Sequence, residues 1–230
     1  MGTVINVITV IIGSLLGVML QSRFPDALKK LLLQGVGLIT VIMGVQMGLK
    51  TDNILIPMGG ILLGGIIGYI LKLDYRLDSL GDKMGKRFSK DTSDSRFSEG
   101  FVMASLIFCV GPLTILGSIN DGLYGDYQLL AVKSVLDGFT SMALAASLGI
   151  GVLFSIITII VVQGGLTLLA GFLGGFFSND VINETTAAGG IIIIGLGIVI
   201  LEIRKLNVAD FLPAIFLVPV IVKIIQLFSK

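Results

Sequence analysis

The segment LLAVKSVLDGFTSMALAAS, from Leu129 to Ser147, is apolar along most of its length, yet it contains Lys133 and Asp137. These two charged residues are four positions apart, which places them on one face of a helix. At 100° per residue, Ser134 and Ser141 fall within the same arc of roughly 120°. A charge at the bilayer centre costs about 2.5–3.5 kcal/mol on insertion scales, so the pair needs partners or water. The segment therefore predicts a transmembrane helix whose polar face looks into the protein.

Similar apolar runs recur along nearly the whole chain. Hydrophobic residues make up 54% of the 230 residues and charged residues only 13%, whereas a soluble domain has about 25% charged residues. Because a span needs ~20 apolar residues, we predict an all-α, polytopic transmembrane helical bundle with about eight spans. The fourth and fifth are interrupted by polar residues, Gly or Pro, and either full crossing or re-entrance fits them. The predicted spans are 3–20, 31–49, 54–71, 100–117, 128–147, 151–176, 187–203 and 208–228.

The distribution of basic residues predicts the orientation. Twelve of the sixteen Lys and Arg residues fall in loops on one side of an eight-span chain, and three fall on the other. The positive-inside rule puts the basic loops in the cytoplasm, so both termini are predicted outside. No basic residue precedes the first apolar run, so we predict a retained span rather than a signal peptide. The twelve are Arg23, Lys29, Lys30, Lys72, Arg76, Lys83, Lys86, Arg87, Lys90, Arg96, Arg204 and Lys205.

Spaced glycines and prolines indicate an internal repeat. Gly37 and Gly44 match Gly190 and Gly197 at one constant offset, and Pro57 matches Pro213 at nearly the same offset. Spans one to three thus resemble spans six to eight, in opposite orientations, which is a plan common among secondary transporters. Chance matching is the alternative in so glycine-rich a chain. The predicted divisions of the single membrane domain are 1–73 (repeat one), 74–98 (cytoplasmic loop), 99–149 (central broken-helix pair) and 150–230 (repeat two).

The fourth apolar run, FCVGPLTILGSINDG from Phe108 to Gly122, contains a predicted helix break. Pro112 removes a backbone hydrogen bond, and Gly111 adds freedom beside it. The helix is then predicted to end at Gly117, Ser118, Asn120, Asp121 and Gly122. At membrane depth the freed backbone groups must be satisfied by protein or by water in a cavity. Broken helices of this kind present carbonyls and helix ends to ions or solutes. The alternative is a proline kink followed by an ordinary outer loop.

These features together predict a substrate or ion site on the fourth and fifth spans. Asp137 would contact a cation or shuttle a proton, and Lys133 would compensate its charge when the site is empty. The alternative is a structural ion pair that fixes helix register. Asn183 and Glu184 are predicted either at an outer vestibule or as caps of the seventh span. The predicted site residues are Asp137, Lys133, Ser134, Ser141, Thr114, Ser118, Asn120 and Asp121.

Other residue patterns limit the function. The chain has no His, and its single Cys109 has no Cys or His neighbours, so no metal site is predicted. It contains no P-loop, HExxH or GxSxG motif, so no enzyme activity and no cofactor are predicted. A net charge of +1 gives no indication of nucleic-acid binding. Asn6, Gln34, Gln46 and Gln163 are uncharged polar residues inside apolar runs and are predicted to form interhelical hydrogen bonds. The predicted partners are the lipid bilayer, a small ion or solute, and possible copies of the same chain through glycine faces.

Four stretches carry a resemblance to a known family: GTVINVITVIIGSLLG, FCVGPLTILGSINDG, KSVLDGFTSMALAASLGIGV and NETTAAGGIIIIGLGI. Together they resemble the bacterial membrane-protein family catalogued as domain of unknown function 554, over essentially the whole chain. The resemblance implies a multi-pass protein of the bacterial inner membrane and no particular substrate. We therefore predict a transporter or channel for a small ion, with a cation favoured, or for a small solute. The alternative is a non-transporting scaffold or sensor.

Overall fold

The computed structural model describes residues 1–21, 23–77, 79, 83, 95–109, 111–173 and 178–228, and this part of the chain is helical and contains no strand. Most of the predicted loop 74–98, including Lys86, Arg87 and Lys90, lies outside the described residues. The elements are α1 (Gly2–Gln21), α2 (Asp26–Gly48), α3 (Leu55–Leu71), α5 (Ser95–Cys109), α6 (Pro112–Tyr124), α7 (Gln128–Leu148), η1 (Gly149–Phe154), α8 (Ser155–Ile159), η2 (Ile160–Gly164), α9 (Gly165–Leu173), α10 (Asn179–Ile200), η3 (Val208–Phe211) and α11 (Ala214–Phe228).

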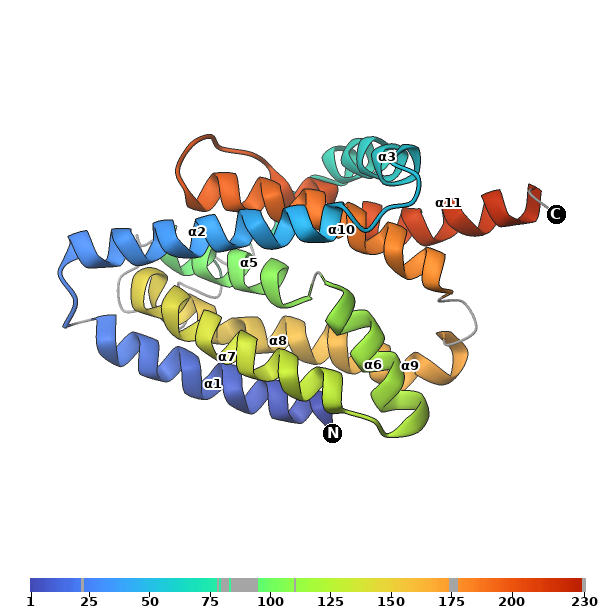
Figure 1. The fold of residues 1–230 in the computed structure, drawn as a ribbon. Coiled ribbons are helices and arrows are strands. Elements are labelled where there is room, and N and C mark those ends of the chain that lie inside the picture. The colour runs from blue at the N-terminus through green and yellow to red at the C-terminus, as the bar shows by residue number, and fades with distance from the viewer. Residues whose placement is uncertain are drawn as a thin grey trace.

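One layer of the bundle is formed by α1, α7 and the run from α8 to α9 (Figure 1). Gly13 and Gly17 let the backbone of α1 lie directly against that of α7, and the two helices run parallel. The chain then reverses at Gly149, whose φ of 84° lies in the left-handed region that favours glycine. The run from α8 to α9 therefore returns antiparallel to α1, and Gln163 lies beside Asn6.

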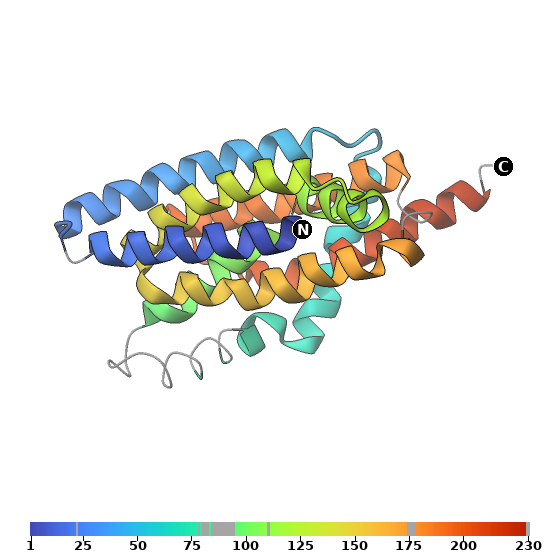
Figure 2. The same ribbon diagram turned by 90° about the horizontal axis from the view of Figure 1, so that it is seen from below.

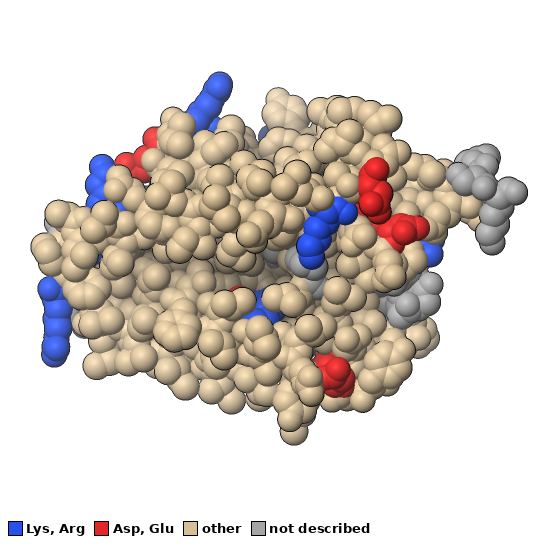
Figure 3. Space-filling view, viewed as in Figure 1, with Lys and Arg blue, Asp and Glu red and all other residues tan. Residues whose placement is uncertain are grey.

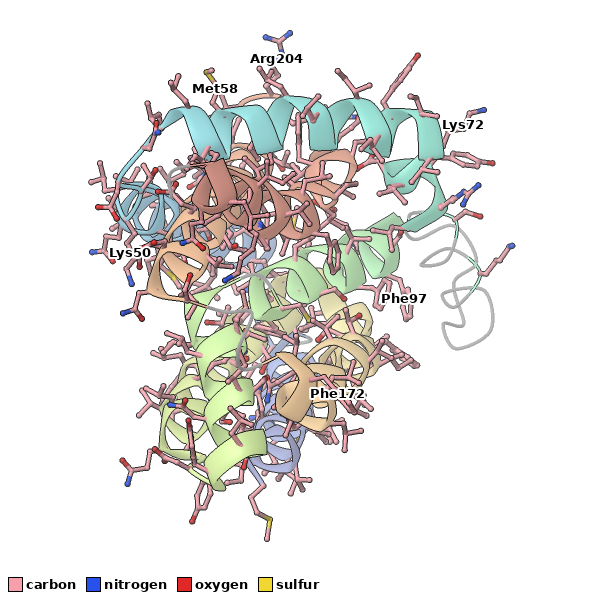
Figure 4. The ribbon with its side chains drawn as sticks, turned by 90° about the vertical axis from the view of Figure 1, so that its right-hand side faces the viewer. Lys50, Met58, Lys72, Phe97, Phe172 and Arg204 are labelled. Atoms are coloured by element: carbon pink, nitrogen blue, oxygen red, sulfur yellow. The ribbon has the colours of Figure 1, made fainter. Side chains whose placement is uncertain are left out.

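The second layer contains α2, α10, α3 and α11, and Figure 4 looks along the long helices of both layers. Gly37 lies against Leu201 and Gly44 against Gly190, so α2 and α10 pack antiparallel. In the same way Gly64 of α3 lies against Ala214 of α11. Figure 1 shows α3 nearly end-on, whereas Figure 4 shows it from the side, so α3 crosses the long helices steeply. Between the layers, Phe108, Leu144 and Val152 belong to the buried apolar core.

Five helical stretches of the described chain are long and apolar enough to cross a membrane, and six if the bent pair of α5 and α6 counts as one. The prediction of a multi-span helical membrane protein is therefore confirmed. The count of eight stays a prediction, because α3 has only 17 residues and the run Gln128–Phe172 is one apolar helical stretch that folds back at Gly149. Figure 3 shows a largely uncharged face with most charged side chains toward its ends, as a bilayer requires.

The interrupted fourth span consists of two helices that meet at an angle of 60°. α5 ends at Cys109, and Pro112 stands in the first turn of α6, where its missing N–H costs nothing. The bend coincides with the break predicted at Gly111 and Pro112. Gly117 is not part of that break: it lies inside α6 against Leu130 of α7. The prediction that the helix ends near Gly117 is wrong, because a helix that restarts at Pro112 continues to Tyr124.

The close approach of α2 to α10 gives a first testable prediction. A Cβ atom at Gly44 would lie 2.8 Å from the carbonyl oxygen of Gly190, a backbone atom that cannot move alone. Gly44→Ala is therefore expected to lower the free energy of unfolding by about 1–3 kcal/mol, the usual cost of overpacking. Thermal unfolding in detergent measures it. Gly35→Ala on the same helix is the control, because a Cβ atom there meets nothing within 4 Å; equal melting temperatures for the two variants would contradict this packing.

Candidate functional site

A buried ion pair lies at the centre of α7. The Lys133 ammonium donates a hydrogen bond to Oδ2 of Asp137, and the two side chains are only 7% and 9% exposed. Asp137 is about 14 Å along a helix that begins at Gln128, at 1.5 Å per residue, which is close to its middle. The pair that the spacing in the sequence predicts is therefore formed deep inside the bundle, far from either end of α7.

Polar side chains from two other segments extend this ion pair into a network. Asn6 of α1 donates from Nδ2 to Oδ2 of Asp137 at 2.9 Å and to Oε1 of Gln163 at 2.9 Å. Gln163 in turn donates to the hydroxyl of Thr3 at 3.3 Å, and the hydroxyls of Thr3 and Thr167 are 3.5 Å apart. A continuous row of polar groups thus leads from the middle of α7 toward the start of α1.

Two features of this network are uncommon in ordinary helix packing. Gln163 lies in η2, a π-helical turn inside an otherwise α-helical run, and such turns occur frequently at functional sites. The amide oxygen Oδ1 of Asn6 is buried and has no hydrogen-bond partner in the part of the chain that is described. An unpaired buried acceptor is costly and is one mark of a position that a water molecule or an ion occupies.

The other predicted site residues lie around this centre with different partners. Ser134 donates to the carbonyl of Leu130 at 2.6 Å, and Ser141 donates to the carbonyl of Gly138 at 2.8 Å. Both hydroxyls thus hydrogen-bond to the backbone of their own helix. Thr114 donates to the carbonyl of Phe108 at 3.1 Å, a group that the break between α5 and α6 leaves without its helical partner.

The remaining predicted residues of α6 differ in what they contact. The hydroxyl of Ser118 is buried and unpaired within the described residues, so it still has an oxygen to offer. Asn120 is half-buried. Asp121 accepts hydrogen bonds from the Gly2 amide at 2.9 Å and from the amino group of Met1 at 2.9 Å and 3.1 Å. Its carboxylate therefore satisfies the first backbone groups of α1, as an acid at a helix N-terminus does.

Glu184 links α10 to the loop between α2 and α3. It is buried in α10, and its carboxylate accepts from the Thr51 hydroxyl at 2.5 Å and from the amides of Asp52 and Asn53 at 2.9 Å and 3.2 Å. It thereby fixes the loop between α2 and α3. The prediction that Asn183 or Glu184 caps the seventh span is wrong, because α10 begins eight residues earlier than predicted and Ser178 is its N-cap. The vestibule prediction for these two residues stays a prediction.

Loss of the Glu184 carboxylate is expected to release that loop. Glu184→Ala removes three hydrogen bonds to a charged acceptor, each worth about 1.5–3 kcal/mol in a buried setting. Amide exchange at Asp52 and Asn53, followed by mass spectrometry on the detergent-solubilised protein, is expected to accelerate at least about tenfold. The control is Asp180→Ala, since Asp180 lies on the exposed part of α10 and accepts from Gln226 instead. Unchanged exchange in Glu184→Ala would show that other contacts hold the loop.

The sequence predicts Asn6 and Gln163 as interhelical hydrogen-bond residues, and nothing in it connects them with Asp137. Their polarity inside apolar runs was the available signal. Their alignment with Asp137 depends on the relative depth of three separate segments and on the π-helical turn. No group of three or more His, Cys, Asp or Glu side chains that could hold a metal ion occurs among the residues that the structure describes.

Comparison with known proteins gives the same family along the whole chain. The model of a family described as "Protein of unknown function (DUF554)" matches residues 1–223. The chain is 31% identical to the uncharacterized membrane protein YdfK of Bacillus subtilis, covering 99% of this chain and 98% of that protein. It is 29% identical to the uncharacterized protein YqgA of Escherichia coli, covering 94% and 93%. No solved structure matches.

Proposed function

We propose, for a chain that belongs to the DUF554 family of proteins of unknown function, a role in moving a small ion or solute across the bacterial cell membrane. A cation is the favoured substrate. The observation that carries the proposal is the Lys133–Asp137 pair at mid-depth of α7, hydrogen-bonded to Asn6 and through it to Gln163. Ionisable groups inside a membrane span are expensive to bury and are typical of substrate and proton pathways.

The arrangement suggests how a cation could be exchanged. In the present state the charge of Asp137 is neutralised by Lys133, and the single carboxylate oxygen Oδ2 accepts hydrogen bonds from both Asn6 and Lys133. If Lys133 moved away, the carboxylate and the unpaired amide oxygen of Asn6 would together present oxygen ligands to a cation. Hard cations prefer oxygen ligands of these two kinds. Lys133 then serves as an internal substitute for the transported cation.

We further propose that the scaffold is an inverted repeat of spans one to three and six to eight, with both termini outside. The antiparallel packing of α2 on α10 supports this arrangement, since two units of opposite orientation bring equivalent helices together in that way. Gly60, Gly64 and Gly68 of α3 likewise meet Val218, Ala214 and Asp210 in reverse order along the chain. In Figure 1, α1 begins at its right-hand end and α11 ends at its right-hand end. Figure 2 shows the same arrangement of the long helices from below.

Flux across a membrane tests the proposal. The purified chain in proteoliposomes is expected to pass at least one of H⁺, Na⁺ and K⁺ faster than protein-free vesicles, as read by trapped ion-sensitive dyes. A fluorescence change equal to that of protein-free vesicles for all three ions, and for a panel of small neutral solutes, would contradict a transport role. The rival is a scaffold or sensor in which the pair only fixes helix register, and the variants in the Discussion separate the two.

A further inference from the structure

A second site lies at the bend between α5 and α6, apart from the polar network. A cavity of about 490 Å³ is bounded by the end of α5, the start of α6, η2 with α9, α10 and α11. None of the residues hydrogen-bonded around Asp137 lines it. A volume of this size is in the range of natural small-molecule sites.

The side chains that line this cavity indicate that a fitting ligand would be mostly apolar. Its walls are mainly aliphatic, with Ile115, Leu166 and Ile215 among them, and no charged side chain lines it in the part of the chain that the structure describes. Val161, Leu169 and Phe216 line it as well and are 67%, 52% and 77% exposed. In a membrane protein these outward side chains face lipid, so the cavity opens sideways into the bilayer. Its occupant is therefore largely hydrocarbon and enters from the membrane.

Two buried hydroxyl groups in the cavity indicate that the ligand also has a polar end. Thr185 and Thr186 of α10 line the cavity and are 3% and 2% exposed. Neither hydroxyl has a hydrogen-bond partner among the described residues, although a helical threonine can bond to the carbonyl one turn earlier. Two adjacent buried hydroxyls without partners are unusual in a folded protein. A ligand group that both donates and accepts hydrogen bonds would satisfy them.

The charge of the head follows from what surrounds it. An ion buried in an apolar site needs a counter-charge, and the lining offers none. The start of α6 at Gly111 lies at the cavity, but the end of α5 at Cys109 lies there too, so the positive and negative ends of two helix dipoles face the same space. A neutral head is therefore favoured over an anion or a cation.

We propose that this cavity binds a single-chain lipid with an uncharged hydroxyl head, whose alkyl chain lies among α9 and α11 and whose hydroxyl pairs with Thr185 and Thr186. The proposal is independent of ion transport, because the two sites share no residue. Such a lipid would enter through the lateral opening and would give the two threonine hydroxyls a hydrogen-bond partner.

Binding of radiolabelled hexadecanol to the full chain in detergent tests the proposal. Saturable binding at one site per chain is expected. Gly165→Phe is expected to lower the affinity at least tenfold, because Gly165 lines the cavity and a side chain there enters open space. Gly171→Phe is the matched control on the same helix, since Gly171 also has open space around it but does not line the cavity. Equal affinities for these two variants would overturn the placement of the site.

The head is tested by removing both hydroxyls. Thr185→Val with Thr186→Val keeps the shape of the side chains and is expected to weaken hexadecanol binding by about three- to tenfold. Binding of hexadecane, which has no head, is expected to stay unchanged in the same variant. An equal loss for both probes, or no loss for hexadecanol, would refute the role of the hydroxyls. Tighter binding of hexadecyl phosphate than of hexadecanol would refute a neutral head.

Discussion

Asp137→Asn is expected to reduce ion flux in proteoliposomes to the level of empty vesicles while the protein still folds and inserts. The amide has the shape of the carboxylate and can still accept hydrogen bonds from Asn6 and Lys133, but it has no charge with which to hold a cation. Lys133 lies one turn nearer the start of α7, about 8 Å from it. Its long stem can then carry the ammonium toward the interface.

The matched control for this variant is Asp126→Asn, which makes the same chemical change at an exposed residue in the loop before α7. Flux in this control is expected to equal that of the unaltered protein. Flux is read with the same dyes, and folding by size-exclusion chromatography and thermal unfolding. Normal flux in a folded Asp137→Asn variant would exclude Asp137 from the pathway.

Lys133→Met is expected to lower the free energy of unfolding more than Asp137→Asn does. It leaves a short carboxylate side chain at mid-depth with no counter-charge, and breaking a buried pair in this way costs about 3–5 kcal/mol. Adding Asp137→Leu removes the stranded charge and is expected to restore most of the stability, because an apolar pair of similar volume is often as stable as the ion pair. Thermal unfolding of the single and double variants measures both effects. A Lys133→Met variant as stable as the unaltered protein would show that another group compensates the charge of Asp137.

Exchanging the two charges separates transport from a purely structural role. Lys133→Asp combined with Asp137→Lys keeps a pair at the same spacing, so stability should recover relative to either single change. The carboxylate, however, moves one helical turn, about 6 Å, away from Asn6. If the pair forms a transport site, ion flux through the double variant is expected to be lost. Full recovery of both stability and flux would favour the register-fixing role of the scaffold alternative.

Part of this architecture follows from residues that are close in sequence. Lys133 and Asp137 share a helical face because of their spacing, and Pro112 interrupts a helix because it lacks an N–H. The predicted fifth span, 128–147, differs from α7 by one residue. Such features depend on one turn of the chain and its covalent chemistry, so a single sequence is enough to predict them.

Other features depend on segments that are distant in sequence. Asn6 meets Gln163 and Asp137 only because α1 packs parallel to α7 and antiparallel to the run that follows it. Glu184 binds the loop at Asp52 because α2 and α10 are antiparallel in one particular register. Apolar content predicts a helix but not its tilt. The sequence therefore predicts an ordinary span over 54–71, whereas α3 crosses the long helices steeply.

Access of water to the side chain at position 137 tests the central claim most directly. In a Cys109→Ala background, Asp137→Cys gives a chain with one thiol on the polar face of α7. Val135→Cys gives one thiol at a side chain that is 55% exposed on the outer surface of the bundle. In proteoliposomes a charged, water-soluble thiol reagent is expected to modify Cys at position 137 and not at position 135. A folded Asp137→Cys protein that no such reagent modifies from either side of the membrane would contradict a hydrated path.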